Sequence, residues 1–284
     1  MISVAERSVH RRWSYFLNPV SIVFHLLQYR DLIKQLARRE VLYRYKGSYF
    51  GITWAFIQPL FKLAVYTFVF SVIFENKWGI SPQEGRLGFA MALFVGILTF
   101  NILEEVGNAA PTLILNHANY VKKVIFPLEI LLVVKQIGTL IHSLFGMVIL
   151  IAGLIMVNHQ LNWTIIMLPL VWFPMVMLSL GLGYFLSSIG VFVRDVGATV
   201  GIFITMLFFL SPIFYPLKAV PEDLRIFCQL NPIAIFVEDA RRVVLWGQYP
   251  HWPWFFAGLV FSTLVFVFGF IWFMRSKNAF ADVM

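Results

Sequence analysis

Six long apolar segments alternate with polar stretches along this chain. They cover residues 52–74, 87–105, 128–157, 165–192, 197–215 and 254–274. A helix needs about 20 mainly apolar residues to cross the hydrocarbon core of a bilayer, and each segment is close to that length or longer. The pattern therefore predicts an all-α polytopic membrane protein with about six transmembrane helices.

The fifth apolar segment ends differently from the others. Ser211-Pro212 and Pro216 lie at its end, and proline interrupts the backbone hydrogen bonding of a helix. Irregular backbone at membrane depth is tolerated where protein buries it. We therefore expect a short re-entrant or outer helical region between this segment and the last span.

The residues just ahead of the first span have a helical period of their own. At 100° per residue, apolar and aromatic side chains share one stripe, and basic side chains flank it. The stripe contains Tyr29, Leu32, Ile33, Leu36 and Tyr43, and the basic residues are Arg30, Lys34, Arg38, Arg39 and Lys46. This pattern is typical of an amphipathic helix at a membrane interface, although a solvated helix packed on the bundle would show it too. We divide the chain into a cytoplasmic N-terminal segment, 1–50, and a transmembrane domain, 51–284.

Composition excludes other classes of protein. Apolar residues make up 60% of the 284 residues and charged residues 13%, against about 45–50% and 25% in soluble domains. Cys228 is the single cysteine, which excludes a disulfide-stapled secreted scaffold. The net charge of +8 does not indicate a nucleic-acid partner, because nine of the 22 Lys and Arg residues fall within 1–50.

The basic residues also predict the orientation. If the N-terminus is inside, the inner segments hold 14 Lys or Arg and the outer segments hold six. Cytoplasmic loops carry such an excess of positive charge. We expect both termini to be cytoplasmic in a multi-pass protein of the bacterial inner membrane.

Several kinds of enzyme site are missing from the sequence. It contains no G-x-x-x-x-G-K-[ST] phosphate loop, no H-E-x-x-H motif and no pair of cysteines. The neighbouring carboxylates Glu104 and Glu105 diverge by 100° on a helix, so they do not face one substrate together. We expect no enzyme activity, cofactor or metal on this chain.

Polar side chains recur at helical spacing within three spans. The first span carries Gln58, Lys62 and Tyr66; the third carries Lys135, Thr139, His142 and Ser143; the fifth carries Thr205, Phe208 and Tyr215. Ionisable groups inside a membrane usually face the bundle interior or a water-filled path. One interpretation is a conduit for a polar substrate, with rings that stack on sugars. The other is helix packing with internally satisfied polar groups.

Several short runs resemble one family of membrane proteins. They are R-E-V-L-Y-R-Y-K-G-S at 39–48, G-I-T-W at 51–54, Q-P-L at 58–60, N-Y-V-K-K-V-I-F-P-L-E-I at 119–130, F-V-R-D-V at 192–196, S-P-I-F-Y-P at 211–216, and Asn231-Pro232. In this order they resemble ABC-2-type transporter permeases. Within that family they look most like the polysaccharide exporters for O-antigen, capsule and teichoic acid, and the O-antigen type is the most similar of these.

The resemblance implies a function and a set of partners. It implies a homodimer of permeases joined to two copies of a separate ATPase subunit, which binds ATP and Mg. It also implies export of a lipid-linked polysaccharide, of O-antigen type, across the inner membrane. A separate ATPase is consistent with the missing phosphate loop.

The resemblance also suggests roles for inner residues. Cytoplasmic elements must transmit motion from the ATPase, and the candidates are Asn119, Tyr120, Lys122, Lys123, Arg194 and Asp195. Arg38, Arg39, Arg44 and Lys46 are candidates for contacting either the diphosphate of the substrate lipid or the ATPase interface.

Other functions remain open from sequence alone. The same architecture exports smaller lipids or drugs in related transporters. A membrane-embedded lipid-sugar transferase and a passive channel belong to different classes, and neither is expected to copurify with an ATPase subunit.

Overall fold

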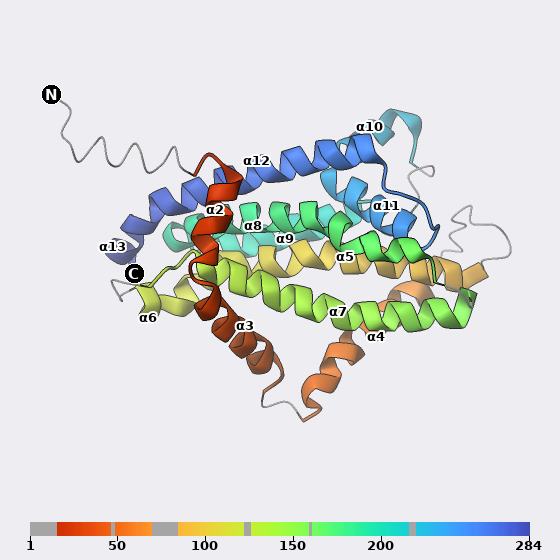
Figure 1. Ribbon diagram of the computed structural model, residues 1–284, viewed down its shortest axis with the longest axis horizontal. Coiled ribbons are helices and arrows are strands. Elements are labelled where there is room, and N and C mark those ends of the chain that lie inside the picture. The colour runs from red at the N-terminus through yellow and green to blue at the C-terminus, as the bar shows by residue number, and fades with distance from the viewer. Residues whose placement is uncertain (1–15, 47–48, 70–84, 122–125, 159–160, 216–219) are drawn as a thin grey trace.

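The computed structural model describes residues 16–46, 49–69, 85–121, 126–158, 161–215 and 220–284. Regular structure in these ranges is helical, and they contain no β-strand, which confirms the predicted all-α class. The long helices lie side by side along the longest axis of the molecule, and a pair of short helices crosses them near one end (Figure 1).

Four of the predicted spans are helices long and apolar enough to cross a membrane. They belong to α5 (Gly85–Leu113), α7 (Ile130–Asn158), α8 (Leu168–Phe192) and α12 (Trp252–Ser276). Two shorter apolar helices, α4 (Trp54–Thr67) and α9 (Val196–Leu210), stand at the predicted first and fifth spans. The end of the first predicted span, residues 70–74, lies outside the described residues. The arrangement confirms a polytopic bundle of about six spans.

Helix α5 extends beyond its predicted end. The prediction stopped at Glu105, but the helix continues to Leu113 and is followed by a turn at Leu115–His117 and by α6 (Ala118–Val121). Adjacent carboxylates normally mark the end of a span, but here both have cationic partners, described below. The helix can therefore continue with apolar residues that pack in the bundle.

Glycines allow the central helix α8 to approach its neighbours closely. A Cβ at Gly181 of α8 or Gly269 of α12 would overlap the backbone of the facing helix. Gly190 meets the backbone at Pro111 of α5 in the same way. Small residues at helix contacts are the usual means of close packing in membranes. Helix α8 is therefore fixed between α5 and α12.

The predicted outer helical region is present between α9 and α12. The segment Ser211–Phe214 is buried, and α10 (Glu222–Leu230) and α11 (Pro232–Val244) follow it. Helix α11 begins at an Asn231-Pro232 cap, in which the Asn231 side chain accepts a hydrogen bond from the backbone N–H of Ile233 at 3.0 Å. It packs against α5, α8 and α12.

Arg241 of α11 fixes this outer region to the bundle. Its side chain is fully buried and donates hydrogen bonds to the carbonyls of Ala92 (3.0 Å), Pro212 (2.8 Å) and Ile213 (2.8 Å). Proline at 212 ends the regular ladder of α9, so nearby carbonyls need other donors. The guanidinium supplies them.

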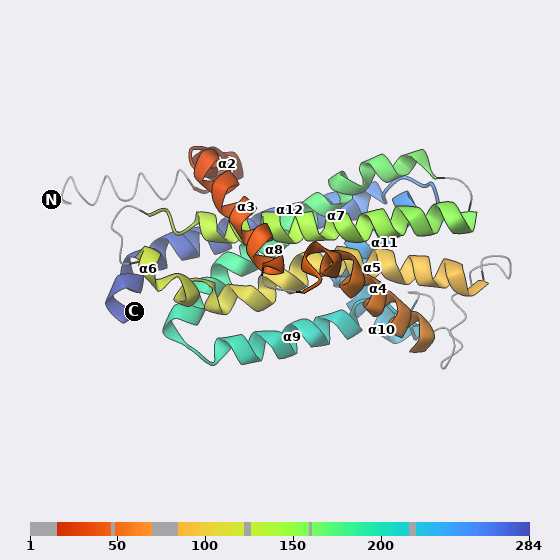
Figure 2. The same cartoon turned by 90° about the horizontal axis from the view of Figure 1, so that it is seen from below.

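The opposite end carries the predicted amphipathic helix. Helix α2 (Pro19–Leu27) leads into α3 (Arg30–Tyr45), and both cross the bundle at the end where α6 and α13 (Phe280–Val283) lie (Figures 1 and 2). Ile33 and Ala37 are buried, and α3 packs against α7. Tyr43, predicted on the apolar stripe, is 64% exposed.

Candidate functional site

A polar cavity of about 620 Å³ lies between α3, α4, α5 and α7. Two predicted conduit residues of α4, Gln58 and Lys62, line it and are exposed. Glu104 and Glu105 of α5 lie in its opposite wall. The cavity therefore offers charged groups and an amide between the helices of the bundle.

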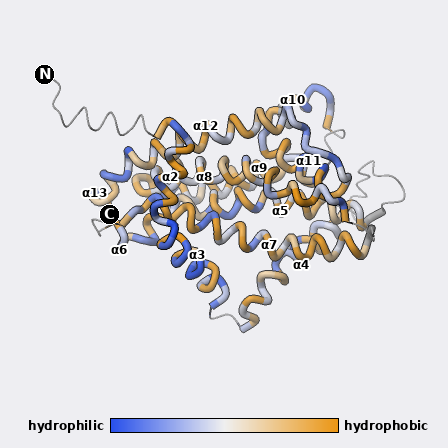
Figure 3. Tube along the Cα trace, viewed as in Figure 1, coloured by the Kyte–Doolittle hydropathy of each residue, from blue (hydrophilic) through white to orange (hydrophobic). Residues whose placement is uncertain are grey.

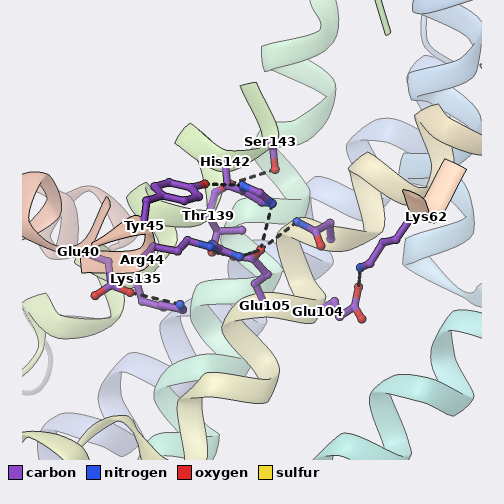
Figure 4. A network of polar contacts seen from close by, with 11 residues as sticks. Glu40, Arg44, Tyr45, Lys62, Glu104, Glu105, Lys135, Thr139, His142 and Ser143 are labelled. Atoms are coloured by element: carbon purple, nitrogen blue, oxygen red, sulfur yellow. Dashed lines mark hydrogen bonds and ion pairs between the residues drawn. The ribbon is translucent and has the colours of Figure 1, made fainter. Parts of the chain in front are cut away.

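The best-formed ion pair beside the cavity joins α3 to α5. Arg44 donates from its two terminal nitrogens to the two carboxylate oxygens of Glu105, at 2.8 and 2.6 Å (Figure 4). This two-point geometry is the strong arrangement of arginine with a carboxylate. The hydrogen bonds to Glu105 also raise the pKa of the Arg44 guanidinium, so α3 is held by a permanent charge.

Polar residues of α7 complete this contact. Thr139 donates to Glu105 at 3.0 Å, and the hydroxyl oxygen of Tyr45 lies 2.9 Å from Nδ1 of His142 (Figure 4). Lys135 donates to Glu40 of α3 at 3.3 Å. The polar row predicted on the third span thus contacts α3 and α5, which favours the packing interpretation for that row.

The second ion pair beside the cavity is looser. Lys62 Nζ lies 3.7 Å from Glu104 Oε2, and their side chains are 46% and 33% exposed. Glu104 and Glu105 point to different partners, as the helical angle between adjacent residues predicts (Figure 4). Lys62 and Glu104 therefore retain capacity for further hydrogen bonds.

An aromatic cluster adjoins the cavity along α4. Its members are Tyr66 of α4, Phe100 of α5, Phe208 of α9, and Phe214 after α9, with ring centroids 4.8–6.0 Å apart in successive contacts. Tyr66 and Phe208 were predicted as conduit residues on separate spans, and the fold brings them together. Aromatic faces of this kind can stack on the apolar faces of sugar rings.

The other two predicted conduit residues of the fifth span use their hydroxyls locally. Thr205 donates to the carbonyl of Gly201 at 2.9 Å. The Tyr215 hydroxyl donates to the carbonyls of Phe209 and Leu210, at 3.2 and 3.1 Å, and so caps the end of α9.

Comparison with known proteins identifies the family. The family model for the ABC-2 type transporter matches residues 31–245, which run from the start of α3 to the end of α11. The chain belongs to the ABC-2 type transporter family.

Individual relatives of this transporter are similar over most of its length. The O-antigen export system permease protein RfbA of Myxococcus xanthus is 26% identical over 226 residues, covering 79% of this chain and 84% of the relative. A protein of the same name from Klebsiella pneumoniae is 21% identical over 256 residues, covering 89% and 95%. The polysialic acid transport protein KpsM of Escherichia coli is 23% identical over 217 residues, covering 76% and 81%.

The predicted coupling residues lie at one end of this ABC-2 transporter chain. Asn119 and Tyr120 belong to α6, and the Tyr120 ring stacks on Phe126 with centroids 4.3 Å apart. Arg194 and Asp195 are exposed in the turn between α8 and α9, near which Gly197 faces the end of α5. Lys122 and Lys123 lie outside the described residues.

The four predicted phosphate-contacting residues have different surroundings. Arg44 is paired with Glu105, as described above. Arg39 and Lys46 lie over the same ring, with their charged atoms 5.8 and 5.5 Å from the centroid of Tyr43. Arg38 lines an apolar groove on the other side of α3.

A buried carboxylate links several segments at the end of the bundle where α6 and α13 lie. The sequence interpretation did not single it out as a site residue. Glu129, just before α7, is 2% exposed; its Oε1 lies 3.0 Å from His25 Nε2, and its Oε2 accepts from Lys277 at 2.7 Å. Burial favours the neutral acid, but the hydrogen bond with His25 and the charge of Lys277 outweigh it and lower the pKa of Glu129. The sequence signal was an acidic residue at the edge of a long apolar segment, without indication of its distant partners.

Proposed function

We propose that this chain is the permease subunit of an ABC transporter that exports a lipid-linked polysaccharide, of O-antigen type, across the bacterial inner membrane. The observation that carries the proposal is the similarity, over 76–89% of this chain, to permeases named for O-antigen and polysialic acid export. Both substrates named there are long carbohydrate polymers. The proposed assembly is a homodimer with two ATPase subunits, which bind ATP and Mg.

The polar cavity supports a role in passing such a polymer. A sugar chain needs hydrogen-bonding groups along its path, but tight binding of any one sugar would stop its movement. Gln58 and Lys62 are exposed in the cavity, and Tyr66 and Phe208 continue the path as rings. We assign the conduit to this side of α4, with Thr205 and Tyr215 farther along α9.

The inner end supports the proposed coupling to the ATPase. Helix α6 and the turn between α8 and α9 lie toward the same end of the bundle as α3 (Figure 2). That turn contains Arg194 and Asp195. We assign ATPase contact to Asn119, Tyr120, Lys122, Lys123, Arg194 and Asp195. With this end cytoplasmic, both termini are cytoplasmic and α10 is periplasmic. Of the basic set around α3, Arg39 and Lys46 remain candidates for the substrate diphosphate or the ATPase interface.

Deletion of the gene tests the substrate class. Cells without this chain should accumulate lipid-linked polymer inside and lose it from the surface, and a plasmid copy should restore export. Normal surface polymer in the deletion strain would contradict the proposal and favour export of a smaller lipid or drug. The chain should also copurify with an ATPase subunit, and its absence from such a complex would favour a transferase or a channel.

Orientation has a separate test. In a Cys228→Ser background, Glu222→Cys should react with a membrane-impermeant thiol reagent from the periplasm, and Asp282→Cys only after the membrane is opened. Both positions are exposed. The reverse pattern would contradict the assigned orientation.

A further inference from the structure

A second hollow lies on the other side of the contact between α3 and α7. It is an apolar groove of about 740 Å³ between α2, α3, α7, α8 and α12. Its floor includes Val133, Ile137 and Ile141, which recur every fourth residue on α7, and Phe266 of α12. Val23 and Leu27 of α2 are 44% and 52% exposed at the groove. Nothing among the described residues covers this apolar surface.

One wall of the groove is basic. Arg30, Lys34 and Arg38 follow one another every fourth residue along α3, and all three line the groove. The apolar row Ile33, Ala37 and Val41 runs beside them on the same helix. Within the described part of the chain, no ion pair joins any of the three cations to a carboxylate. Three cations thus stand in a line along an open apolar surface.

The helices around this groove differ in hydropathy. The tube of α3 is coloured as mainly hydrophilic with apolar positions interspersed, whereas α7 and α12 are mainly hydrophobic (Figure 3). The basic row spans about 12 Å at 1.5 Å per residue. This charge and shape complement a molecule with an anionic head and apolar chains.

We propose that the groove is a binding site for a resident anionic glycerophospholipid. Its phosphate lies against Arg30, Lys34 and Arg38, and its acyl chains lie against α7, α8 and α12. The groove offers three cations and, beyond them, mainly apolar side chains, so it has little that would hold sugars. The polar cavity with Lys62 lies on a different face of α7. The lipid packs against α3 on the side away from the polar cavity. It is separate from the transported substrate.

Native mass spectrometry of the purified full-length chain tests the proposal. The protein is equilibrated with phosphatidylglycerol or phosphatidylcholine of identical acyl chains, and retained lipid is counted per chain. Phosphatidylglycerol should be retained preferentially. Lys34→Gln with Arg38→Gln should weaken that retention about 25-fold, since each basic side chain near an anionic lipid surface contributes roughly fivefold.

A matched pair on the same helix is the control. Arg39→Gln with Lys46→Gln also removes one arginine and one lysine, but neither residue lines the groove. This control should retain phosphatidylglycerol as the unmodified protein does. Equal losses in the two double variants, or equal retention of the two lipids, would overturn the proposal.

The apolar part of the site has its own test. Ile137→Trp fills the groove and should lower lipid retention, whereas Leu144→Trp, at an exposed position of α7 outside the groove, should not. Unchanged melting temperatures show that each variant folds. Unchanged lipid retention in folded Ile137→Trp would overturn the proposal.

Two further outcomes identify a different occupant. Displacement of phosphatidylglycerol by an equal concentration of a synthetic polyprenyl diphosphate would assign the groove to the substrate lipid. Cross-linking of Leu27→Cys to another protein chain in the assembled transporter would assign it to a protein interface. Either result would replace the proposed resident lipid.

Discussion

The region around Arg241 and the polar cavity beside Lys62 both place a cation among apolar helices, but the two cations have different surroundings. Arg241 is fully buried, and its nitrogens donate to three carbonyls. Lys62 is 46% exposed and lies 3.7 Å from a single, partly exposed carboxylate. A buried cation that is hydrogen-bonded to several carbonyls stabilises the fold. A cation with spare donors is available to a ligand.

The two carboxylates of α5 repeat this contrast at adjacent positions. Glu105 accepts from Arg44 and Thr139 and is 14% exposed, whereas Glu104 faces only the loose pair with Lys62. Substitutions at neighbouring positions can therefore separate stability from transport.

The largest effect on stability is expected at Arg241. Arg241→Met leaves three carbonyls without their donor, and each unsatisfied buried group costs about 1–3 kcal/mol. We expect the free energy of unfolding to fall by at least about 3 kcal/mol. Thermal unfolding in detergent measures this. Arg242→Met is the control, because Arg242 contributes one hydrogen bond, to the carbonyl of Tyr249. Equal effects of the two substitutions would contradict the role given to Arg241.

The next largest loss of unfolding free energy is expected at Glu105, and the loss at Glu104 should be smaller. Glu105→Gln weakens a charge-assisted contact and should cost about 1.5–3 kcal/mol of unfolding free energy. Glu104→Gln should cost less than about 1 kcal/mol, as exposed ion pairs do. The two variants are compared by melting temperature in the same detergent. A larger loss from Glu104→Gln would reverse the comparison.

The buried carboxylate of Glu129 predicts that stability depends on pH. Because the native-state pKa of Glu129 is lowered, its contribution to stability is present above the unfolded-state value of about 4.3 and is lost as pH falls through the native value. The melting-temperature difference between the unmodified protein and Glu129→Gln should thus shrink as the pH falls below about 4. A difference that grows below about pH 4 would contradict the lowered pKa of Glu129.

The smallest effect on stability is expected at Lys62. Lys62→Leu removes one exposed ion pair, so the unfolding free energy should change by less than about 1 kcal/mol. Polysaccharide export should nevertheless fall severalfold, and Lys62→Arg, which keeps the charge, should restore most of it. Surface polymer is quantified in cells at equal protein level. Normal export by Lys62→Leu would remove Lys62 from the conduit.

The spans and the amphipathic helix were predictable because they depend on local patterns. Apolar length identified α5, α7, α8 and α12, and the helical period identified α3 almost to its ends. The end of α5 was predicted too early because charge at Glu104 and Glu105 usually ends a span. Only the fold shows that Arg44, far away in sequence, neutralises Glu105.

Part of the candidate site was also predictable, because that part depends on spacing within one helix. The row Gln58, Lys62 and Tyr66 follows from spacing within one helix, and the structure places two of its members in a cavity and the third in an aromatic cluster. Pairings between helices are not encoded in local spacing. The link from Glu129 to His25 and Lys277, and the groove beside Arg30 and Lys34, therefore required the fold.

Thiol labelling at position 62 tests whether this position of α4 faces the path of the polymer. In a Cys228→Ser background, the transporter assembled with its ATPase and carrying Lys62→Cys is exposed to a small aqueous thiol reagent, at rest and during ATP hydrolysis. We predict that Cys at 62 reacts with the reagent, that a bulky reagent blocks export, and that transported polymer slows labelling. A thiol that stays unreactive in both states, together with normal export by Lys62→Leu, would contradict a conduit along α4 and assign these residues to helix packing.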